Sequence, residues 1–263
     1  MTNEPSRSPA SRMPVVFIGH GSPMNAIEDN PWSRGWTALG ASLPTPRAIV
    51  CVSAHWYVRG TYVTDNEAPE TIYDFGGFPP ELSRVTYPAP GDRVLANTVA
   101  AVLSSVRAAP RGDWGLDHGA WSVLLRLRPA ADVPVVQVSL DRGAPPSAHL
   151  AMGQALGSLR GQGVLILASG NVTHNLHHAL RGGGTLPPWA SGFDADIARA
   201  IEQRDHAFLI GALETEAGRH AHPSPDHYLP LLWAVGAAGD SAATFPITGF
   251  ALGSLSMRAV LWR

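Results

Sequence analysis

The fold is decided by a short stretch near the start of the chain, Val15-Val16-Phe17-Ile18-Gly19-His20-Gly21-Ser22-Pro23. Its apolar residues predict a buried strand from about Pro14 to Ile18, and the glycines and proline that follow predict a tight turn. The strand therefore delivers His20 to its carboxyl end, which is where open α/β sheets bind ligands. The flanking glycines leave room for a metal ion or a substrate. Taken alone, His20 is equally well read as a hydrogen-bonded turn histidine.

The same arrangement recurs twice along the chain. An apolar run from about Ala48 to Ala54 leads into His55, and a run from Gly163 to Ser169 is followed by a turn of small residues and then by His174. If the three strands are parallel neighbours in one sheet, their carboxyl ends bring the three imidazoles to one edge.

Helical periodicity separates these strands. The residues 92–107 and 146–159 read as amphipathic or crossover helices, and 133–140 as a further strand. Alternating strands and helices predict a parallel sheet with right-handed connections, covered on both faces. The fold class is therefore α/β, a single-domain three-layer α/β/α architecture with a mostly parallel central sheet. The residues 194–213 read as one long helix, and 254–262 as a half-exposed edge strand.

Composition bounds the function. The chain has 263 residues, 45% of them hydrophobic and 15% charged, and a net charge of -2, which suits one large domain. No basic stripe indicates a nucleic-acid partner, and no apolar run approaches the ~20 residues of a membrane span. The residues 1–12 lack the apolar core of a signal peptide, so we expect a flexible terminus on a cytoplasmic protein. The only cysteine, Cys51, falls in a predicted buried strand, which excludes a disulfide framework and a thiolate metal site.

An aromatic-rich segment lies between residues 57 and 90. It includes Tyr73, Phe75 and Phe78 among glycines, prolines and acids, and it shows no sustained period from 67 to 90. Long irregular loops are uncommon in compact domains unless they are functional. The segment is either an Ω-loop closed on its own aromatics or a lid over a planar substrate.

Two more histidines lie near expected helix starts. His118 stands in a glycine-rich turn before a helical run from Ser122 to Leu127, so its pattern does not predict burial. Further on, Ser224 as N-cap and Pro225 as first residue predict a helix with Asp226 and His227 in its first turn. The alternatives are a capping or surface histidine and an acid that complements the helix dipole.

The histidine set points to a metal site. Neutral imidazoles suit zinc or iron(II) better than magnesium or calcium, which prefer oxygen ligands, but they do not choose between the two metals. A Ser/His/Asp hydrolase is disfavoured because the chain has no Gly-x-Ser-x-Gly elbow. The histidines concerned are His20, His55, His118, His174 and His227.

At these residues the chain resembles a known family, the DOPA 4,5-dioxygenase type of extradiol ring-opening dioxygenases, relatives of the catalytic subunit of protocatechuate 4,5-dioxygenase. The resemblance runs from about Val15 to the carboxyl end. It is carried by Gly19-His20-Gly21-Ser22-Pro23-Met24, Ser53-Ala54-His55-Trp56, Tyr73-Asp74-Phe75-Gly76-Gly77-Phe78-Pro79, Asp117-His118-Gly119, Ser169-Gly170-Asn171-Val172-Thr173-His174-Asn175-Leu176 and Pro225-Asp226-His227-Tyr228-Leu229-Pro230-Leu231.

The resemblance implies one non-haem metal ion, Fe(II) or Zn(II), held by His20, His55 and His227. It makes His174 a further ligand or an acid/base, and His118 a residue that hydrogen-bonds substrate or dioxygen. The implied reaction opens a catechol ring beside its two hydroxyls and places both atoms of dioxygen in the product. The residues 13–263 would then be the catalytic domain of a monomer or small homo-oligomer, whose partners are a small aromatic diol and dioxygen.

One position departs from the family's pattern. Ring-cleaving relatives commonly hold the metal with two histidines and a carboxylate, whereas the third position here is His227, beside Asp226. An all-histidine site favours zinc retention. Two alternatives therefore remain: a zinc hydrolase with His174 or His118 as base, and a non-catalytic binding protein, against which the retained histidines argue.

Overall fold

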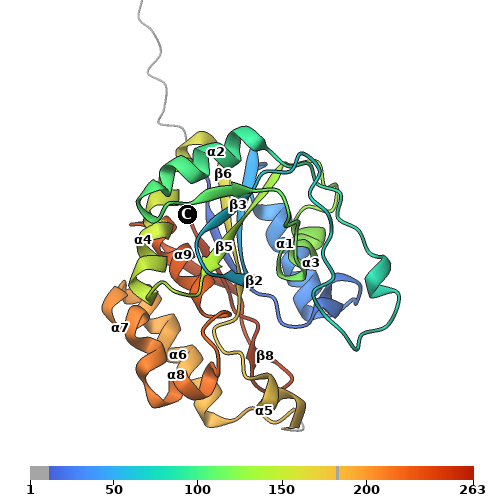
Figure 1. Ribbon diagram of the computed structural model, residues 1–263. Coiled ribbons are helices and arrows are strands. Elements are labelled where there is room, and N and C mark those ends of the chain that lie inside the picture. The colour runs from blue at the N-terminus through green and yellow to red at the C-terminus, as the bar shows by residue number, and fades with distance from the viewer. Residues whose placement is uncertain (1–11, 182–183) are drawn as a thin grey trace, which may run out of the picture.

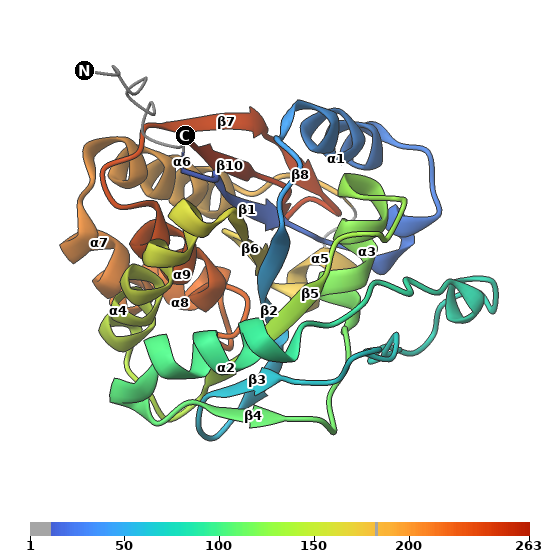
Figure 2. The same cartoon turned by 90° about the horizontal axis from the view of Figure 1, so that it is seen from above.

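The computed structural model describes residues 12–181 and 184–263, so the predicted flexible terminus lies outside the described residues except for Arg12. Within them, the central sheet has eight strands in the order β4-β3-β5-β2-β6-β1-β10-β7 (Figure 2). The strands of this sheet are β1 (Val15–Gly19), β2 (Ala48–Val58), β3 (Tyr62–Thr64), β4 (Ala109–Arg111), β5 (Val135–Asp141), β6 (Val164–Gly170), β7 (Ala243–Ile247) and β10 (Ala259–Trp262). A separate hairpin is formed by β8 (Phe250–Ala251) and β9 (Leu255–Ser256).

The four central strands, β5, β2, β6 and β1, are parallel neighbours. In their register Ile18 pairs with Ser169, and Ser53 pairs with the same residue from the other side. The strands β1, β2 and β6 therefore run toward the same edge, where β1 and β6 end level with each other and β2 continues to Val58. This confirms the expectation that the three parallel strands share one edge.

Helices cover both faces of this sheet, with α1 and α3 on one side and α2, α4 and α9 on the other (Figures 1 and 2). The α-helices are α1 (Pro31–Ser42), α2 (Arg93–Val102), α3 (His118–Leu127), α4 (Pro146–Leu156), α5 (Leu176–Arg181), α6 (Pro188–Gln203), α7 (His206–Gly211), α8 (Glu216–Ala221) and α9 (Leu229–Ala238). Short 3-10 helices occupy Pro23–Ala26, Leu82–Arg84, Ser104–Val106, Gly157–Gln162 and Ala212–Glu214. None of the helices in the described chain is long and apolar enough to cross a bilayer.

Strand residues alternate between two buried clusters, as a sheet covered on both faces requires. In β1, Val15 and Phe17 join the cluster under α4 and α9, whereas Val16 and Ile18 join the cluster under α1 and α3. Cys51 lies in the second cluster, and burial raises the pKa of its thiol well above the usual value. The three-layer α/β/α prediction is confirmed.

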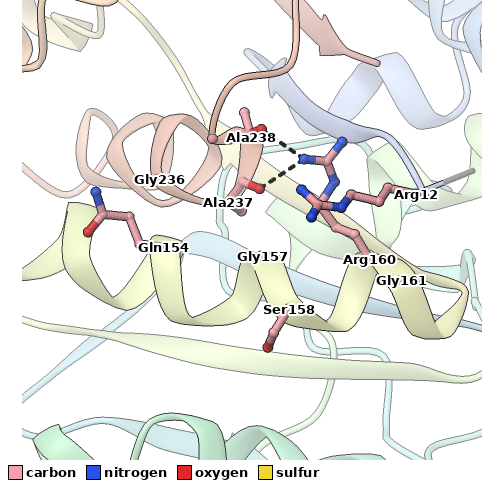
Figure 3. Close-up of a pocket in the computed structure, with 10 residues that line it drawn as sticks. Arg12, Gln154, Gly157, Ser158, Arg160, Gly161, Gly236, Ala237 and Ala238 are labelled. Atoms are coloured by element: carbon pink, nitrogen blue, oxygen red, sulfur yellow. Dashed lines mark hydrogen bonds between the residues drawn. The ribbon is translucent and has the colours of Figure 1, made fainter.

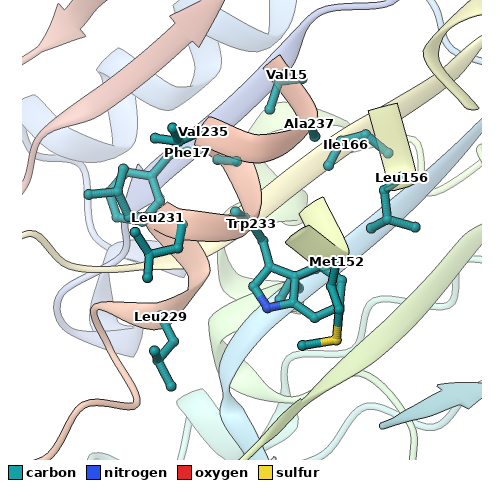
Figure 4. Close-up of a cluster of buried hydrophobic side chains, with 14 of the residues drawn as sticks. Val15, Phe17, Met152, Leu156, Ile166, Leu229, Leu231, Trp233, Val235 and Ala237 are labelled. Atoms are coloured by element: carbon teal, nitrogen blue, oxygen red, sulfur yellow. The ribbon is translucent and has the colours of Figure 1, made fainter. Parts of the chain in front are cut away.

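The helix α9 is buried along its whole length against the sheet and α4 (Figure 4). Its Trp233 packs beside Met152 and Leu156 of α4. The indole Nε1 of Trp233 donates a hydrogen bond to Nδ1 of His149 (2.9 Å), and Nε2 of His149 lies 3.1 Å from the carbonyl oxygen of Asp141. One buried imidazole thus joins α9, α4 and the end of β5.

Arg160 joins the segment just before β1, at the amino ends of the parallel strands, to the end of α9 (Figure 3). Its guanidinium donates to the carbonyl oxygens of Met13 (2.6 Å), Ala237 (3.2 Å) and Ala238 (2.8 Å). A cavity of about 380 Å³ opens beside it. Because these donors satisfy the last carbonyls of a helix, we assign Arg160 to the fold.

Three sequence predictions about elements are wrong. The predicted helix 194–213 is broken where Arg204 adopts a positive φ of 56° and Asp205 caps α7. The predicted half-exposed edge strand is buried, because β10 lies between β1 and β7. The last predicted helix begins at Leu229 rather than Pro225, since Pro230 has no N–H to bond the carbonyl of Asp226.

Candidate metal centre

Five histidines converge at the carboxyl edge of the parallel strands. His20 follows β1, His55 lies in β2, His118 begins α3, His174 follows β6 and His227 precedes α9. Their ring centroids are close: 5.0 Å from His20 to His55, 5.2 Å from His20 to His227 and 3.8 Å from His55 to His118. All five line one cavity of about 350 Å³. The structure therefore brings together every histidine that the sequence singled out.

An irregularity in β2 places His55 in this group. The strand pairs regularly with β5 up to Val52, and the pairing resumes in a shifted register at Tyr57. A bulge of this kind lets a strand turn a side chain toward a site. The strand is also longer than expected, so His55 lies inside β2 rather than just beyond it.

His20 is held by a hydroxyl at the end of the neighbouring strand. The Ser169 hydroxyl donates to the carbonyl oxygen of Gly119 (2.6 Å), so it accepts from Nδ1–H of His20 (2.9 Å). The Nε2 atom of His20 is then left with a lone pair and lies 3.2 Å from Nε2 of His55. Burial, and after it the neighbouring imidazoles, lowers the pKa of His20 well below its usual range.

Asp74 orients two of the histidines at once. Its Oδ2 atom accepts from Nδ1 of His118 (2.9 Å) and lies 3.1 Å from Nδ1 of His55, while Oδ1 accepts from the backbone N–H of His118 (2.9 Å). Burial alone raises the pKa of the Asp74 carboxyl, but the two imidazoles outweigh it and bring the pKa well below the usual value. Burial lowers the pKa of His118. Burial is also the largest single influence on His55, but the bond to Asp74 and the charges of Asp117, Asp74 and Asp226 together outweigh it, so the pKa of His55 rises.

His227 is fixed by its neighbour in sequence and by the end of β6. Its Nδ1 atom lies 2.5 Å from Oδ2 of Asp226, and its carbonyl oxygen accepts from the backbone N–H of Asn171 (2.9 Å). A Cβ atom on Gly170 would collide with that carbonyl oxygen, so glycine is required for this close approach. Burial, and then the charge of neighbouring imidazoles, lowers the pKa of His227 well below its usual range.

His174 differs from the other four histidines. Its ring stacks on His227 with centroids 3.4 Å apart and an angle of 3° between the planes. Its backbone N–H donates to the carbonyl of Ala221 (3.0 Å), but in the described chain its ring has no hydrogen-bond partner. Burial, and after it the charge of His222, lowers the pKa of His174 to about 3.

The donor atoms suit a metal ion. The ligand nitrogens of His20, His55 and His118 all lie within 4.8 Å of one another. Two nitrogens bound to one ion at about 2.1 Å each lie roughly 3.0–3.5 Å apart, which matches the 3.2 Å between His20 and His55. Oxygen acceptors on Nδ1 keep Nε2 as the coordinating atom, as around bound metals. The expected ligand set omitted His118, which the geometry adds as a further candidate.

A buried carboxylate braces the start of α3. Asp117 caps the helix by accepting from the N–H of Ala120 (3.1 Å), and it also accepts from the Ser53 hydroxyl (2.6 Å) and from the amide of Gln137. These bonds join α3 to β2 and β5. They hold His118 under cover with 6% of its surface exposed, so the expectation that His118 is unburied is wrong.

Two of the predicted lid aromatics line the cavity. Phe75 packs edge-on against His118 with centroids 5.6 Å apart, and Phe78 packs edge-on against Phe75 at 5.4 Å. Tyr73 packs instead on Trp121, and its hydroxyl donates to the carbonyl of Val85 (2.7 Å). In the described chain Tyr73 is therefore outside the lining, where it supports Phe75 rather than facing the cavity.

Sequence reasoning did not assign Asp74, Ser169 or Asp117 a role. Asp74 lies in an irregular segment where no period marks an inward position. Ser169 is a lone polar residue at the end of an apolar strand, and this was the available signal. Asp117 stands just before the glycine-rich helix start, where an N-cap is expected.

The parallel sheet and the histidine cluster define an α/β protein with a candidate metal centre at the carboxyl edge of its strands, and the comparisons agree. The family model described as the catalytic LigB subunit of aromatic ring-opening dioxygenase matches residues 14–253. The chain belongs to this family and is an extradiol ring-cleaving dioxygenase.

Similar proteins cover nearly the whole chain. It is 45% identical to the 4,5-DOPA dioxygenase extradiol of Escherichia coli K12 over 95% of both chains. It is 38% identical to the protein of the same name from Beta vulgaris, over 87% of this chain and 88% of the relative. The crystal structure of an uncharacterized Escherichia coli K12 protein superposes with a TM-score of 0.84 at 41% identity, covering 96% of this chain and all of the other.

Proposed function

We propose that this protein is a metal-dependent dioxygenase that opens the ring of a small catechol beside its two hydroxyls, using dioxygen. The observation that carries the proposal is the arrangement of imidazoles at one sheet edge, with Nδ1 of His20, His55, His118 and His227 each held by an oxygen atom. Relatives named for DOPA make a catechol the natural candidate substrate.

The metal ligands in this proposal are His20, His55 and His227, with His174 as a further ligand in a resting zinc form. When bound, iron(II) supplies the Lewis acidity that acidifies a catechol hydroxyl and the redox chemistry that activates dioxygen. The absence of a carboxylate among the proposed ligands is what favours zinc retention, so the metal that acts must be tested directly.

The chain's own side chains position the substrate and move its proton. A nitrogen of the His174 ring, which has no partner in the described chain, accepts the proton of the second catechol hydroxyl. His118, anchored through Nδ1 to Asp74, offers Nε2 to the substrate or to dioxygen. Phe75 and Phe78 cover the aromatic ring and exclude water.

Reconstitution tests this proposal. The metal-free protein is loaded anaerobically with Fe(II) or Zn(II), and oxygen uptake is followed with catechol and with DOPA. We expect uptake only in the iron form, and we expect His20→Ala to lose most bound metal while circular dichroism shows an intact fold. Stoichiometric metal in His20→Ala would contradict the ligand set. No oxygen uptake, combined with ester hydrolysis by the zinc form, would favour the zinc hydrolase.

The variant His174→Ala separates a base from a ligand. As the base, its loss leaves metal and catechol binding intact and slows turnover roughly a hundred-fold or more, the usual scale for a positioned acid/base. Metal content by elemental analysis and single-turnover rates measure the two effects. Loss of the metal would instead make His174 a ligand, and full oxygen uptake by the metal-loaded variant would exclude both roles.

A further inference from the structure

The mouth of the histidine cavity is lined by apolar side chains. Phe78, Leu176, Leu180 and Leu252 line it and are 38%, 48%, 78% and 51% exposed, so they lie between the histidines and solvent. We call these four residues the mouth cluster. They come from three separate segments: the aromatic loop, α5 and the turn between β8 and β9. The hairpin carrying Leu252 and the helix α5 lie together at the same end of the molecule (Figure 1).

Apart from the proposed metal ion and the histidines that surround it, no described side chain that lines this cavity is a cation. Of the residues that line it in the described chain, the only one with a formal charge is Asp74, which is negative and already bonded to His55 and His118. The sequence has no lysine at all, and the two residues after Arg181 that are not described are glycines. A substrate carboxylate would therefore meet leucine side chains and a carboxylate instead of a partner, and burying it there is costly.

Leu252 reaches the mouth at a conformational cost. Its φ is +50°, a left-handed conformation in which glycine and asparagine are at ease and a leucine side chain is strained. The residue is also half-exposed, so burial in the core does not explain the leucine. Strain at a residue that lines a site is typically retained for binding rather than for stability.

We propose that the mouth cluster is a hydrophobic subsite, and that the enzyme prefers catechols with an uncharged alkyl or aryl substituent over catechols with an amino-acid side chain. With the catechol hydroxyls at the histidines, the opposite side of the ring points to the mouth. An alkyl group there packs on the leucines and is removed from water. The charged end of DOPA stays in water at best and leaves the leucines uncovered. This inference rests on the proposed function and specifies its substrate.

A matched substrate series tests the inference on the iron-loaded holoenzyme. The first series compares catechol with 4-methyl-, 4-ethyl- and 4-propylcatechol. The second compares 4-propylcatechol with DOPA, which carries an ammonium and a carboxylate, with dopamine, which carries only the ammonium, and with dihydroxyphenylpropionate, which carries only the carboxylate. We expect kcat/KM to rise about fourfold per added methylene, the usual gain for burying one such group. We expect DOPA to fall at least tenfold below 4-propylcatechol, and the carboxylate to cause more of this loss than the ammonium.

Anaerobic calorimetry of the same compounds keeps the inference separate from the proposed function. If no catechol supports oxygen uptake, the proposed function fails, and the binding series still decides the subsite. DOPA binding as tightly as 4-propylcatechol, or an affinity that is flat along the alkyl series, would overturn the inference.

Variants assign the effect to the mouth cluster. Leu180→Ala and Leu252→Asn should flatten the alkyl series, with Leu252→Asn at an equal or higher thermal midpoint because asparagine tolerates the positive φ. Val94→Ala is the matched control, since Val94 is 78% exposed, like Leu180, but lies on α2 outside the cavity lining. A Leu252→Asn protein that is less stable and keeps the full alkyl series would show that Leu252 serves the fold instead.

Discussion

At the scale of single residues, the site depends on which ring nitrogen of each histidine is held. The Ser169 hydroxyl holds Nδ1 of His20, and the Asp74 carboxylate holds Nδ1 of both His55 and His118. Nε2 of each ring is therefore the atom available to a metal ion or a substrate. Asp74 thus sets the orientation of two imidazoles with one carboxylate. Among the residues that do not bind the metal themselves, Asp74 is the one whose loss should lower metal affinity most.

We predict that Asp74→Asn lowers metal affinity about 10- to 100-fold, the usual cost of removing an outer partner of metal-binding histidines. The amide keeps the size of the carboxylate but offers one oxygen, so it cannot accept all three bonds that Asp74 receives from His55 and His118. A chelator titration measures the affinity. Asp113→Asn is the control, because Asp113 is exposed and bonds to Arg111. Affinity within twofold of the parent would refute the role.

At the scale of elements, the predictable parts were those with a local cause. The strands β1 and β6 were predicted because apolar runs end in glycine, and their carboxyl ends place His20 and His174 as expected. Which side chains contact these histidines depends on the tertiary structure. The contact of Asp74 with His55 and His118 comes from an irregular segment with no period to read.

Two of the three wrong element predictions depend on contacts between residues that are distant in sequence. The alternating residues before Trp262 read as a half-exposed edge, but β10 pairs with β1 and β7 along its two edges, and its side chains join the buried clusters on both faces of the sheet. At the last helix, Ser224 and Pro225 predict a start that the structure does not show. Helix α9 begins at Leu229 instead, because Pro230 lacks an N–H and the carbonyl of His227 accepts a hydrogen bond from Asn171 outside the helix. Long-range partners override local signals in both cases.

At the scale of the whole molecule, the layer opposite α1 and α3 contains a titratable group in its core. Nδ1 of His149 accepts from the indole of Trp233, so its proton lies on Nε2, toward the carbonyl of Asp141. If Nδ1 were protonated, its N–H would face the indole N–H of Trp233, and both groups are donors. Burial lowers the pKa of His149 to about 4, from an ordinary value of 6.5. The folded protein therefore holds this imidazole neutral where the unfolded chain would charge it.

This difference predicts acid destabilisation of the fold, independent of catalysis. Because the folded pKa is the lower one, the unfolded chain binds more protons between pH 6.5 and about 4, so the contribution of His149 to stability is full above that window and is lost as the pH falls through it. We expect the free energy of unfolding by urea to drop by about 2 kcal/mol more between about pH 7 and pH 5 in the parent than in His149→Gln. His177→Gln, at an exposed position of α5, serves as the control and should follow the parent. Any change in stability with pH that arises from metal release is common to all three proteins and cancels in the comparison. Parallel pH curves for parent and His149→Gln would show that His149 is charged or solvated in the folded state, contrary to its bonds with Trp233 and Asp141.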